Sequence, residues 1–542
     1  MQLNPLASYK GVVNRFLQLY KHVIGLLIGG FVTYVRGLPV IRRRRLRSPI
    51  KRSLAFFLKF LIKKEIRNQP FEIQLRRRLE MLGPTYVKLG QVMAIREDLL
   101  PSNITSELKQ LLDNLPEVPF EQILAIIEES LDRPSKSMFL EIKTKPLGSA
   151  SIGQTHRATT SHGVPVVLKV IKPGIRETIL SDLKLLQLLG GVLEVIIPRY
   201  QPQVIIEEFC NYTQREIDLI YEADHAELFA ANFDGHPHIV FPKIFREYSS
   251  RDVLCMEFFD GLKPNDPKIL ELSQSELNKV IDYGIGAIIK MLFQDAFFHA
   301  DLHAANLIVM PGPKIGFIDL GMVGRFEEKT KRSMLYYFFS LVNGDIERSA
   351  KHLLSMANFG PGGDPAGFKR AVSDLLRRYL IQSSHGNFSL AQLILESLAI
   401  GGKYRVFFPV EMTLMVKALV TYEGVGNFLN PKMDIPELSK KHISVIYRDY
   451  FNPKHLWQEL VRSMPEMLDV AIQLPKLITD GSRAVDEFLS ESRRENPLAG
   501  LKSSLIAGSC IVGGVIALVQ GGPPILWIGL FASSVLFFLF GK

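Results

Sequence analysis

The sequence HADLHAANLIV at residues 299–309 is followed closely by GFIDLGM at residues 316–322. Pro311, Gly312 and Pro313 stand between the two motifs and favour a tight turn joining two apolar, strand-like runs. A hairpin there would bring the amide of Asn306 close to the carboxylate of Asp319. Oxygen ligands of this kind, together with phosphate oxygens and water, suit Mg²⁺. The two motifs therefore predict a magnesium site at this hairpin.

The spacing inside the first motif indicates the chemistry. Asp301 is followed, after four residues, by Asn306. This is the catalytic-loop spacing of protein kinases, in which the Asp accepts or orients a hydroxyl proton and the Asn holds a metal ion. Asp319 stands where those enzymes place the metal-binding Asp of the DFG motif. The order and spacing predict Mg²⁺ and ATP, or ADP, as cofactors.

The same stretch has a rival interpretation. His299, Asp301 and His303 alternate along what could be a strand, a pattern that would also suit a zinc or iron site. A purely structural role for these residues is the other alternative. The kinase-like spacing is favoured because it also explains Asn306 and Asp319.

Upstream residues complete a nucleotide site. Lys169 lies in the β-branched strand VVLKVI, residues 166–171, and matches the kinase strand lysine that contacts nucleotide phosphates. Glu222, in a helical stretch, is its predicted partner. The preceding segment PLGSASIGQTHRA, residues 146–158, is rich in small residues that let a backbone approach phosphates. It has fewer glycines than a kinase GxGxxG loop, and it is not a Walker A loop.

Composition limits the class of protein. The 542 residues are 47% hydrophobic and 22% charged, which excludes a long disordered chain, and the formal net charge is +10. Basic residues crowd positions 36–52 without a nucleic-acid module, so they favour an anionic membrane surface. The preceding apolar run, residues 23–35, predicts an interfacial helix. The three cysteines are far apart, which favours buried thiols in a reducing compartment: Cys210, Cys255 and Cys510.

Changes in sequence character divide the chain. The expected fold class is α+β, a protein-kinase-like two-lobed fold with an N-terminal helical extension and a C-terminal transmembrane helical hairpin. The regions are a basic, partly amphipathic segment (1–70), a helical extension (71–145), a mixed lobe (146–262), a helical lobe (263–500) and the hairpin (503–540).

The hairpin prediction depends on two nearly uncharged runs, residues 503–519 and 525–540, separated by a Gly/Pro turn. Their alternative is a pair of buried helices in a soluble domain. Basic residues flank the runs, and by the positive-inside rule both ends and the catalytic body would be cytoplasmic: Arg493, Arg494, Lys502 and Lys542.

With these motifs the chain resembles the UbiB family, also called the ABC1, AarF or coenzyme-Q kinase-like family. The signature is YVKLGQ, whose family positions are Lys88, Gly90 and Gln91. The family's nucleotide loop corresponds to Gly148, Ser149, Ala150 and Ser151, and its ExD motif to Glu216 and Asp218. Its strand lysine, helix glutamate, catalytic loop and metal Asp correspond to Lys169, Glu222, Asp301, Asn306 and Asp319.

The sequence departs from the family in two places. Leu302, Ala304 and Ala305 replace two prolines and a glycine in the catalytic loop, and Gly148 replaces an alanine. The resemblance implies that the segment carrying Lys88 folds over the active site, with Lys88 paired to Glu216 or Asp218. No APE-like activation segment follows Asp319, so a platform for a peptide substrate is missing.

The resemblance therefore implies an atypical kinase or ATPase that supports prenylquinone biosynthesis, with ubiquinone as the expected product, at the inner membrane of a bacterium. The implied partners are membrane lipids, prenylquinone intermediates and quinone-biosynthesis enzymes; nucleic acid is not expected. Two alternatives stay open: a small-molecule phosphotransferase of the aminoglycoside or choline kinase type, and a nucleotide-binding membrane scaffold without turnover.

Overall fold

The computed structural model describes residues 5–37, 57, 69–96, 100–111, 117–196, 201–360, 362–383, 389–450, 452, 501–519 and 523–540. The chain divides into two compact units, Met1–Tyr450 and Phe451–Lys542. The basic cluster at residues 42–52 and the charged residues at 493 and 494 lie outside the described residues. The expectations that rest on them stay predictions.

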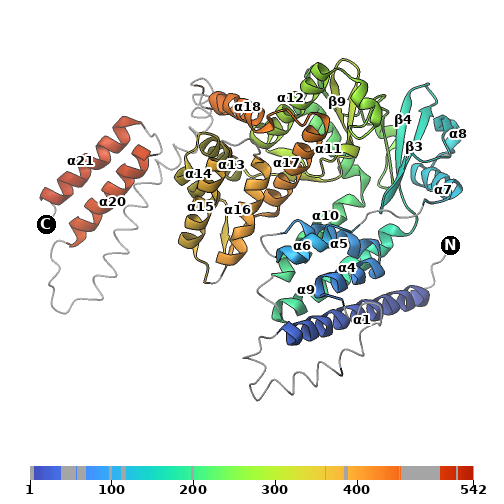
Figure 1. Cartoon of the computed structure of the whole chain (residues 1–542), viewed down its shortest axis with the longest axis horizontal. Coiled ribbons are helices and arrows are strands. Elements are labelled where there is room, and N and C mark those ends of the chain that lie inside the picture. Colours follow the sequence, from blue (N-terminus) through green and yellow to red (C-terminus); the bar gives the residue numbers. More distant parts are fainter. Residues whose placement is uncertain are drawn as a thin grey trace. The chain divides into compact units, whose positions relative to one another are not determined.

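The mixed lobe is built on an antiparallel sheet in the order β1-β3-β4-β6, with β2 paired to β3. The strands are β1 (Phe139–Ile142), β2 (Gly148–Ser149), β3 (Gly153–Thr160), β4 (Pro165–Ile171) and β6 (Val253–Glu257). Helices α7 (Phe120–Leu131) and α8 (Ser135–Met138) lie beside the sheet (Figure 1). Because side chains alternate along β4, Val166, Leu168 and Val170 are fully buried in this core, and Lys169 points to the opposite face.

Helices that follow β4 in the chain connect this sheet to the rest of the unit. They are α9 (Ile175–Ile196), α10 (Pro202–Glu216) and α11 (Leu219–Asn232). Asp218 is the N-cap of α11 and accepts a hydrogen bond of 3.2 Å from the backbone N–H of Ile220. This cap fixes the start of the helix that carries Glu222.

The helical lobe contains a short sheet, β5-β9-β8, formed by β5 (Ile239–Val240), β8 (Leu307–Met310) and β9 (Lys314–Phe317). The predicted hairpin at Pro311-Gly312-Pro313 is confirmed, since β8 and β9 pair antiparallel on either side of it. A second small sheet pairs β7 (Phe297–His299) with β10 (Val323–Arg325). The catalytic loop lies in the chain between β7 of the second sheet and β8 of the first.

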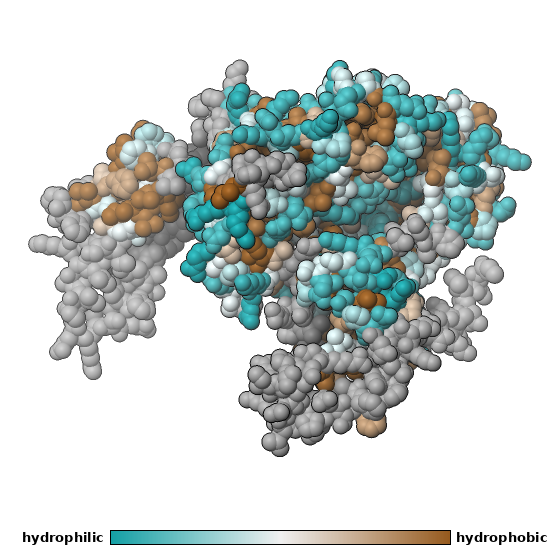
Figure 2. All heavy atoms as spheres, in the orientation of Figure 1, coloured by the Kyte–Doolittle hydropathy of each residue, from teal (hydrophilic) through white to brown (hydrophobic). Residues whose placement is uncertain are grey.

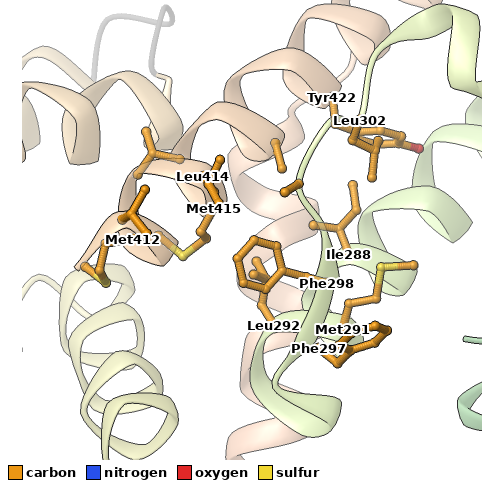
Figure 3. Packing of buried hydrophobic residues seen from close by; sticks show 14 of the residues in the cluster. Ile288, Met291, Leu292, Phe297, Phe298, Leu302, Met412, Leu414, Met415 and Tyr422 are labelled. Atoms are coloured by element: carbon orange, nitrogen blue, oxygen red, sulfur yellow. The ribbon is translucent and has the colours of Figure 1, made fainter. Parts of the chain in front are cut away.

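Helices surround these strands: α12 (Gln274–Lys290), α13 (Glu328–Val342), α14 (Ile346–Leu354), α15 (Pro365–Ser383), α16 (Leu390–Tyr404), α17 (Val410–Leu429) and α18 (Ile435–Tyr450). A further two-stranded pair, β11 (Asn358–Phe359) and β12 (Val406–Phe407), ties α16 to the loop after α14. Leu302 of the catalytic loop lies in the apolar core with Ile288 of α12 and Tyr422 of α17 (Figure 3). The leucine that departs from the family pattern thus anchors the loop.

The region expected to form a helical extension, residues 71–145, contains α4 (Phe71–Leu82), α5 (Pro84–Ala94) and α6 (Ser102–Leu108), followed by α7, α8 and the strand β1. Helix α1 (Pro5–Gly37) lies before it, in the region 1–70. Helix α1 packs on α4, where Arg78 and Gln74 press against the backbone at Gly25 and Gly29. The apolar run at residues 23–35 therefore contacts protein along part of its length.

The C-terminal unit contains α20 (Leu501–Val519) and α21 (Pro524–Phe540), which pack against each other. Two helices were predicted here and both are found. Among the described residues, however, no helix is both long and apolar enough to cross a membrane, so the transmembrane part of the prediction is not supported.

Candidate active site

Lys169 of β4 contacts two carboxylates, those of Glu222 on α11 and of Asp319 after β9. Lys169 Nζ lies 2.9 and 2.8 Å from the two carboxylate oxygens of Glu222, and 2.7 Å from Oδ1 of Asp319. Burial would lower the pKa of Lys169, but the two carboxylates raise it overall. Burial raises the pKa of Glu222, while the charge of Lys169 lowers the pKa of Asp319. Lys169 thus stays an ammonium, with an ionised Asp319 beside it.

The backbone at Asp319 is strained. Its φ of 57° lies in the left-handed region, which non-glycine residues rarely adopt and which is concentrated at functional positions. A side chain at Gly321 would place its Cβ 3.3 Å from Oε2 of Glu222. The tight turn after β9 therefore aims the Asp319 carboxylate at Lys169.

His299 organises the catalytic loop through hydrogen bonds of both ring nitrogens. Its Nδ1 accepts a 3.1 Å hydrogen bond from the backbone N–H of Asp301, and its Nε2 donates to the carbonyl of Ile318 at 3.2 Å. Burial lowers the pKa of His299, which agrees with this neutral tautomer. Both ring nitrogens are occupied, and within the described part of the chain no group of three or more His, Cys, Asp or Glu side chains could hold a metal. The zinc or iron alternative is not supported.

The side chain of Asn306 is oriented for a metal ligand. Its Nδ2 donates to the backbone carbonyl of Asp301 at 3.0 Å, and Ile318 N donates to the carbonyl of Asn306 at 3.0 Å. Among the described residues Oδ1 of Asn306 accepts no hydrogen bond, so an oxygen remains for coordination. An amide oxygen and an ionised carboxylate on one hairpin fit Mg²⁺, whose remaining ligands come from phosphates and water.

Asp301 has a partner that the sequence motifs did not indicate. Lys417 Nζ, on α17, lies 2.7 Å from Oδ1 of Asp301, and His303 Nε2 lies 3.7 Å from Oδ2. Burial would raise the pKa of Asp301, but the charge and hydrogen bond of Lys417 lower it to about 2. Lys417 lies 116 positions after Asp301, and no short motif links the two residues. A lysine inside an otherwise buried helical run, between Val416 and Ala418, was the only available signal.

The small-residue loop forms a tight hairpin next to Lys169. Gly148 and Ser149 pair with Thr155 and Gln154, and Ala150 N donates to the carbonyl of Gly153 at 2.9 Å. Ser151 is buried. Because β3 and β4 pair with Thr155 opposite Lys169, the loop lies next to the lysine on neighbouring strands of one sheet. This placement suits backbone contacts to phosphates.

The segment with the YVKLGQ signature forms α5. Lys88 donates to Oε1 of Glu216, at the end of α10. Asp218 does not join this pair; it caps α11 and lies 2.9 Å from Nε of Arg251. Gly90 packs against Leu79 and Leu111, where its hydrogen makes room.

Gln91, the last residue of the signature, faces the segment that follows α6. Its Nε2 donates to the carbonyl of Leu111 at 3.4 Å. The structure therefore brings Lys88 and Glu216 together, while Asp218, Gly90 and Gln91 have other contacts.

Two regions of the chain match known protein domains. Residues 110–353 match the ABC1 atypical kinase-like domain, and residues 372–434 match the UbiB helical domain. The chain is 30% identical over 418 residues to a protein named probable protein kinase UbiB from Marinobacter nauticus, covering 75% of this chain and 76% of that protein. A protein of the same name from Aeromonas salmonicida is 28% identical over 478 residues, covering 85% and 87%.

The complex of Rv3197 with erythromycin from Mycobacterium tuberculosis aligns over 67% of this chain and 93% of that chain, with 20% identity and a TM-score of 0.46.

Proposed function

Since the chain belongs to the UbiB family of ABC1 atypical kinase-like proteins, we propose that it is an atypical kinase or ATPase that binds Mg-ATP and supports ubiquinone biosynthesis. The observation that carries the proposal is the ion-paired set Lys169, Glu222 and Asp319, with Lys169 within 2.9 Å of both carboxylates. An ion-paired strand lysine beside a metal-binding Asp is what a kinase-like phosphate site requires.

Each group has a chemical task in this proposal. Lys169, held by Glu222, binds nucleotide phosphates as a point charge. Asn306 and Asp319 hold Mg²⁺, which when bound neutralises phosphate charge. Asp301 orients the hydroxyl of water or of a small acceptor, because its carboxylate is ionised and its backbone carbonyl is held by Asn306.

The acceptor is proposed to be water or a small polar headgroup rather than a protein. After Asp319 the chain enters β10, which pairs with β7, and then α13 begins at Glu328. This short connection leaves no segment for a peptide platform. The Lys88–Glu216 pair holds α5 against α10, and we propose that this extension acts as a lid over the site.

Membrane attachment is proposed for the C-terminal hairpin. Its helices expose many large apolar side chains, and the space-filling view shows apolar surface over them (Figure 2). Ile525 is 87% exposed, an unfavourable state in water that contact with lipid would relieve. Further exposed members are Ile511, Val512, Val515, Ile516, Leu518, Leu526, Ile528 and Val535. The proposed location is the inner membrane of a bacterium, with the catalytic unit on the cytoplasmic side.

The decisive experiment is quantification of quinones and their intermediates in a deletion strain complemented with wild type or Asp319→Asn. Loss of ubiquinone that only wild type restores supports the proposal. In parallel, Asp319→Asn should abolish Mg-dependent nucleotide binding while the protein stays folded. Substrate-dependent phosphate transfer to a small molecule would favour the phosphotransferase alternative, and nucleotide binding without turnover would favour the scaffold.

A further inference from the structure

Lys417 occupies an unusual position on its helix. The surrounding residues Met412–Val416 and Ala418 are buried, so the pattern of α17 would suit an apolar side chain at position 417. Lys417 instead extends toward the catalytic loop, and its side chain is 34% exposed, the same fraction as that of Asp301. The ammonium therefore lies beside the catalytic Asp at a partly solvent-exposed position rather than in the core.

The segments that carry Lys417 and Asp301 are both anchored in the fold. Leu302, next to Asp301, lies in the same apolar core as Tyr422 and Met415 of α17 (Figure 3). On the loop side, the backbone of Asp301 is fixed by His299 and Asn306. Helix α17 also lies against β10, the strand that follows Asp319. Core packing thus positions the helix that carries Lys417, and hydrogen bonds position the loop that carries Asp301.

The chemistry of the ammonium leaves it capacity for a ligand. A lysine ammonium has three N–H donors, and the structure assigns one of them to Oδ1 of Asp301. No second partner of Lys417 is found among the described residues. The remaining donors lie next to the carboxylate that orients the phosphate acceptor. In a kinase-like site the phosphoryl group in transfer lies next to that acceptor, and Asn306 and Asp319 would hold the metal ion that neutralises its charge.

Electrostatics points the same way. Asp301, Glu222 and Asp319 supply three carboxylates, and Lys169 is already paired with two of them. A phosphoryl group brought beside the ionised Asp301 would be repelled unless a cation stood there. His303 is farther away, at 3.7 Å, and is charged only when protonated. Lys417 is the cation that the fold places at this point.

We propose that Lys417 is a phosphoryl-binding residue, supplied to the kinase-like site by the UbiB helical domain, which stabilises the phosphoryl group during transfer. The proposal rests on the proposed ATP turnover. In hydrolysis the bond from the γ-phosphorus to the β–γ bridging oxygen breaks, and a bond to the water oxygen forms. The bridging oxygen leaves on ADP, and the water proton passes by way of Asp301 to solvent. Lys417 supplies charge and hydrogen bonds only. Residues 372–434, the match to the helical domain, include Lys417, so this domain would complete the active site.

The test compares full-length wild type with Lys417→Met and Lys417→Arg, using Lys432→Met as the matched control. Lys432 is exposed, lies in the same domain match and forms no ion pair among the described residues. The measurements are kcat and KM for Mg-ATP hydrolysis, Kd for Mg-ADP, and the tightening of Mg-ADP binding by fluoroaluminate, which mimics the phosphoryl group in transfer. Circular dichroism verifies folding.

For Lys417→Met we expect kcat to fall roughly 100- to 1000-fold and the fluoroaluminate tightening to disappear. Mg-ADP binding should stay within about threefold of wild type, because ADP lacks the transferred group. Lys417→Arg should recover part of kcat, and Lys432→Met should behave as wild type. Unchanged turnover in Lys417→Met overturns the inference. Faster turnover also overturns it, and would mean that Lys417 restrains Asp301 in the wild type. Loss of Mg-ADP binding together with folding, shared by Lys417→Arg, would show a purely structural role and also overturns it.

Failure of the proposed function gives a different result. If wild type shows no hydrolysis, the fluoroaluminate comparison of wild type and Lys417→Met still decides the role of Lys417. If wild type binds no Mg-nucleotide at all, both the proposed function and the role of Lys417 are rejected.

Discussion

Lys88 and Glu216 are 128 positions apart, and their side chains form an ion pair that joins α5 of the N-terminal extension to the end of α10. Glu216 stands two residues before Asp218, the cap of α11, and α11 carries Glu222, the partner of Lys169. The extension is therefore connected to the nucleotide site through one short stretch of chain. This connection gives a physical route by which the lid would affect nucleotide handling.

The first prediction concerns this pair. Lys88→Ala should leave the protein folded, because both side chains are only partly buried, but it should loosen α5. We expect a change of about threefold to tenfold in nucleotide affinity, about 1 kcal/mol, and a gain in autophosphorylation. The measurements are nucleotide titration and phosphate incorporation, with Asp319→Asn as the inactive control. Wild type that phosphorylates generic proteins as readily as Lys88→Ala would refute the lid.

The second prediction concerns the helix glutamate. Glu222→Gln removes the charge that holds Lys169, so the ammonium should bind Asp319 more tightly and leave the phosphates. Mg-ATP affinity should fall about tenfold or more, measured by calorimetry.

A matched control lies on the same helix. Glu227 makes an exposed pair with Arg246, so Glu227→Gln should leave nucleotide affinity unchanged. Equal effects of the two substitutions would mean that Glu222 acts through general stability.

The third prediction concerns packing at Gly90. A Cβ there would lie 2.8 Å from Cδ1 of Leu79 and also collide with Leu111, so Gly90→Ala forces two core side chains to move. We expect a loss of about 1–3 kcal/mol in the free energy of unfolding.

Gly191, on α9, is the control, because a Cβ there meets no atom within 4 Å. Gly191→Ala should be neutral or stabilise by a few tenths of a kcal/mol, since helices favour alanine over glycine, by about 1 kcal/mol at most. Denaturant unfolding of both variants provides the comparison, and equal midpoints would contradict the close packing of α4, α5 and α6.

The fourth prediction concerns the C-terminal hairpin. Truncation before Lys502 should release most of the protein from anionic vesicles, and Ile525→Glu should weaken flotation because it places a charge among exposed apolar side chains. Leu188→Glu on α9, at a side chain 69% exposed in the other unit, is the control. Full vesicle binding by the truncated protein in high salt would show that the hairpin is not the main attachment.

The sequence by itself determined the features that depend on short segments. The turn at Pro311-Gly312-Pro313, the strand around Lys169 and the order of Asp301, Asn306 and Asp319 are local patterns, so the kinase-like lobes could be predicted. Two helices near the C-terminus were equally clear from their apolar runs. The apolar runs at residues 503–519 and 525–540 correspond closely to α20 and α21, and both runs are slightly shorter than a typical membrane span.

Only the tertiary structure decided which distant side chains meet. Asp218 turned out to cap α11 and to pair with Arg251, leaving Glu216 for Lys88, since the choice depends on how α10 ends. Lys417 reaches Asp301 because α17 packs against the core that holds Leu302. Helical periodicity predicts which face is buried but not against which partner. The contact that completes the active site is therefore set by side-chain packing over the whole lobe.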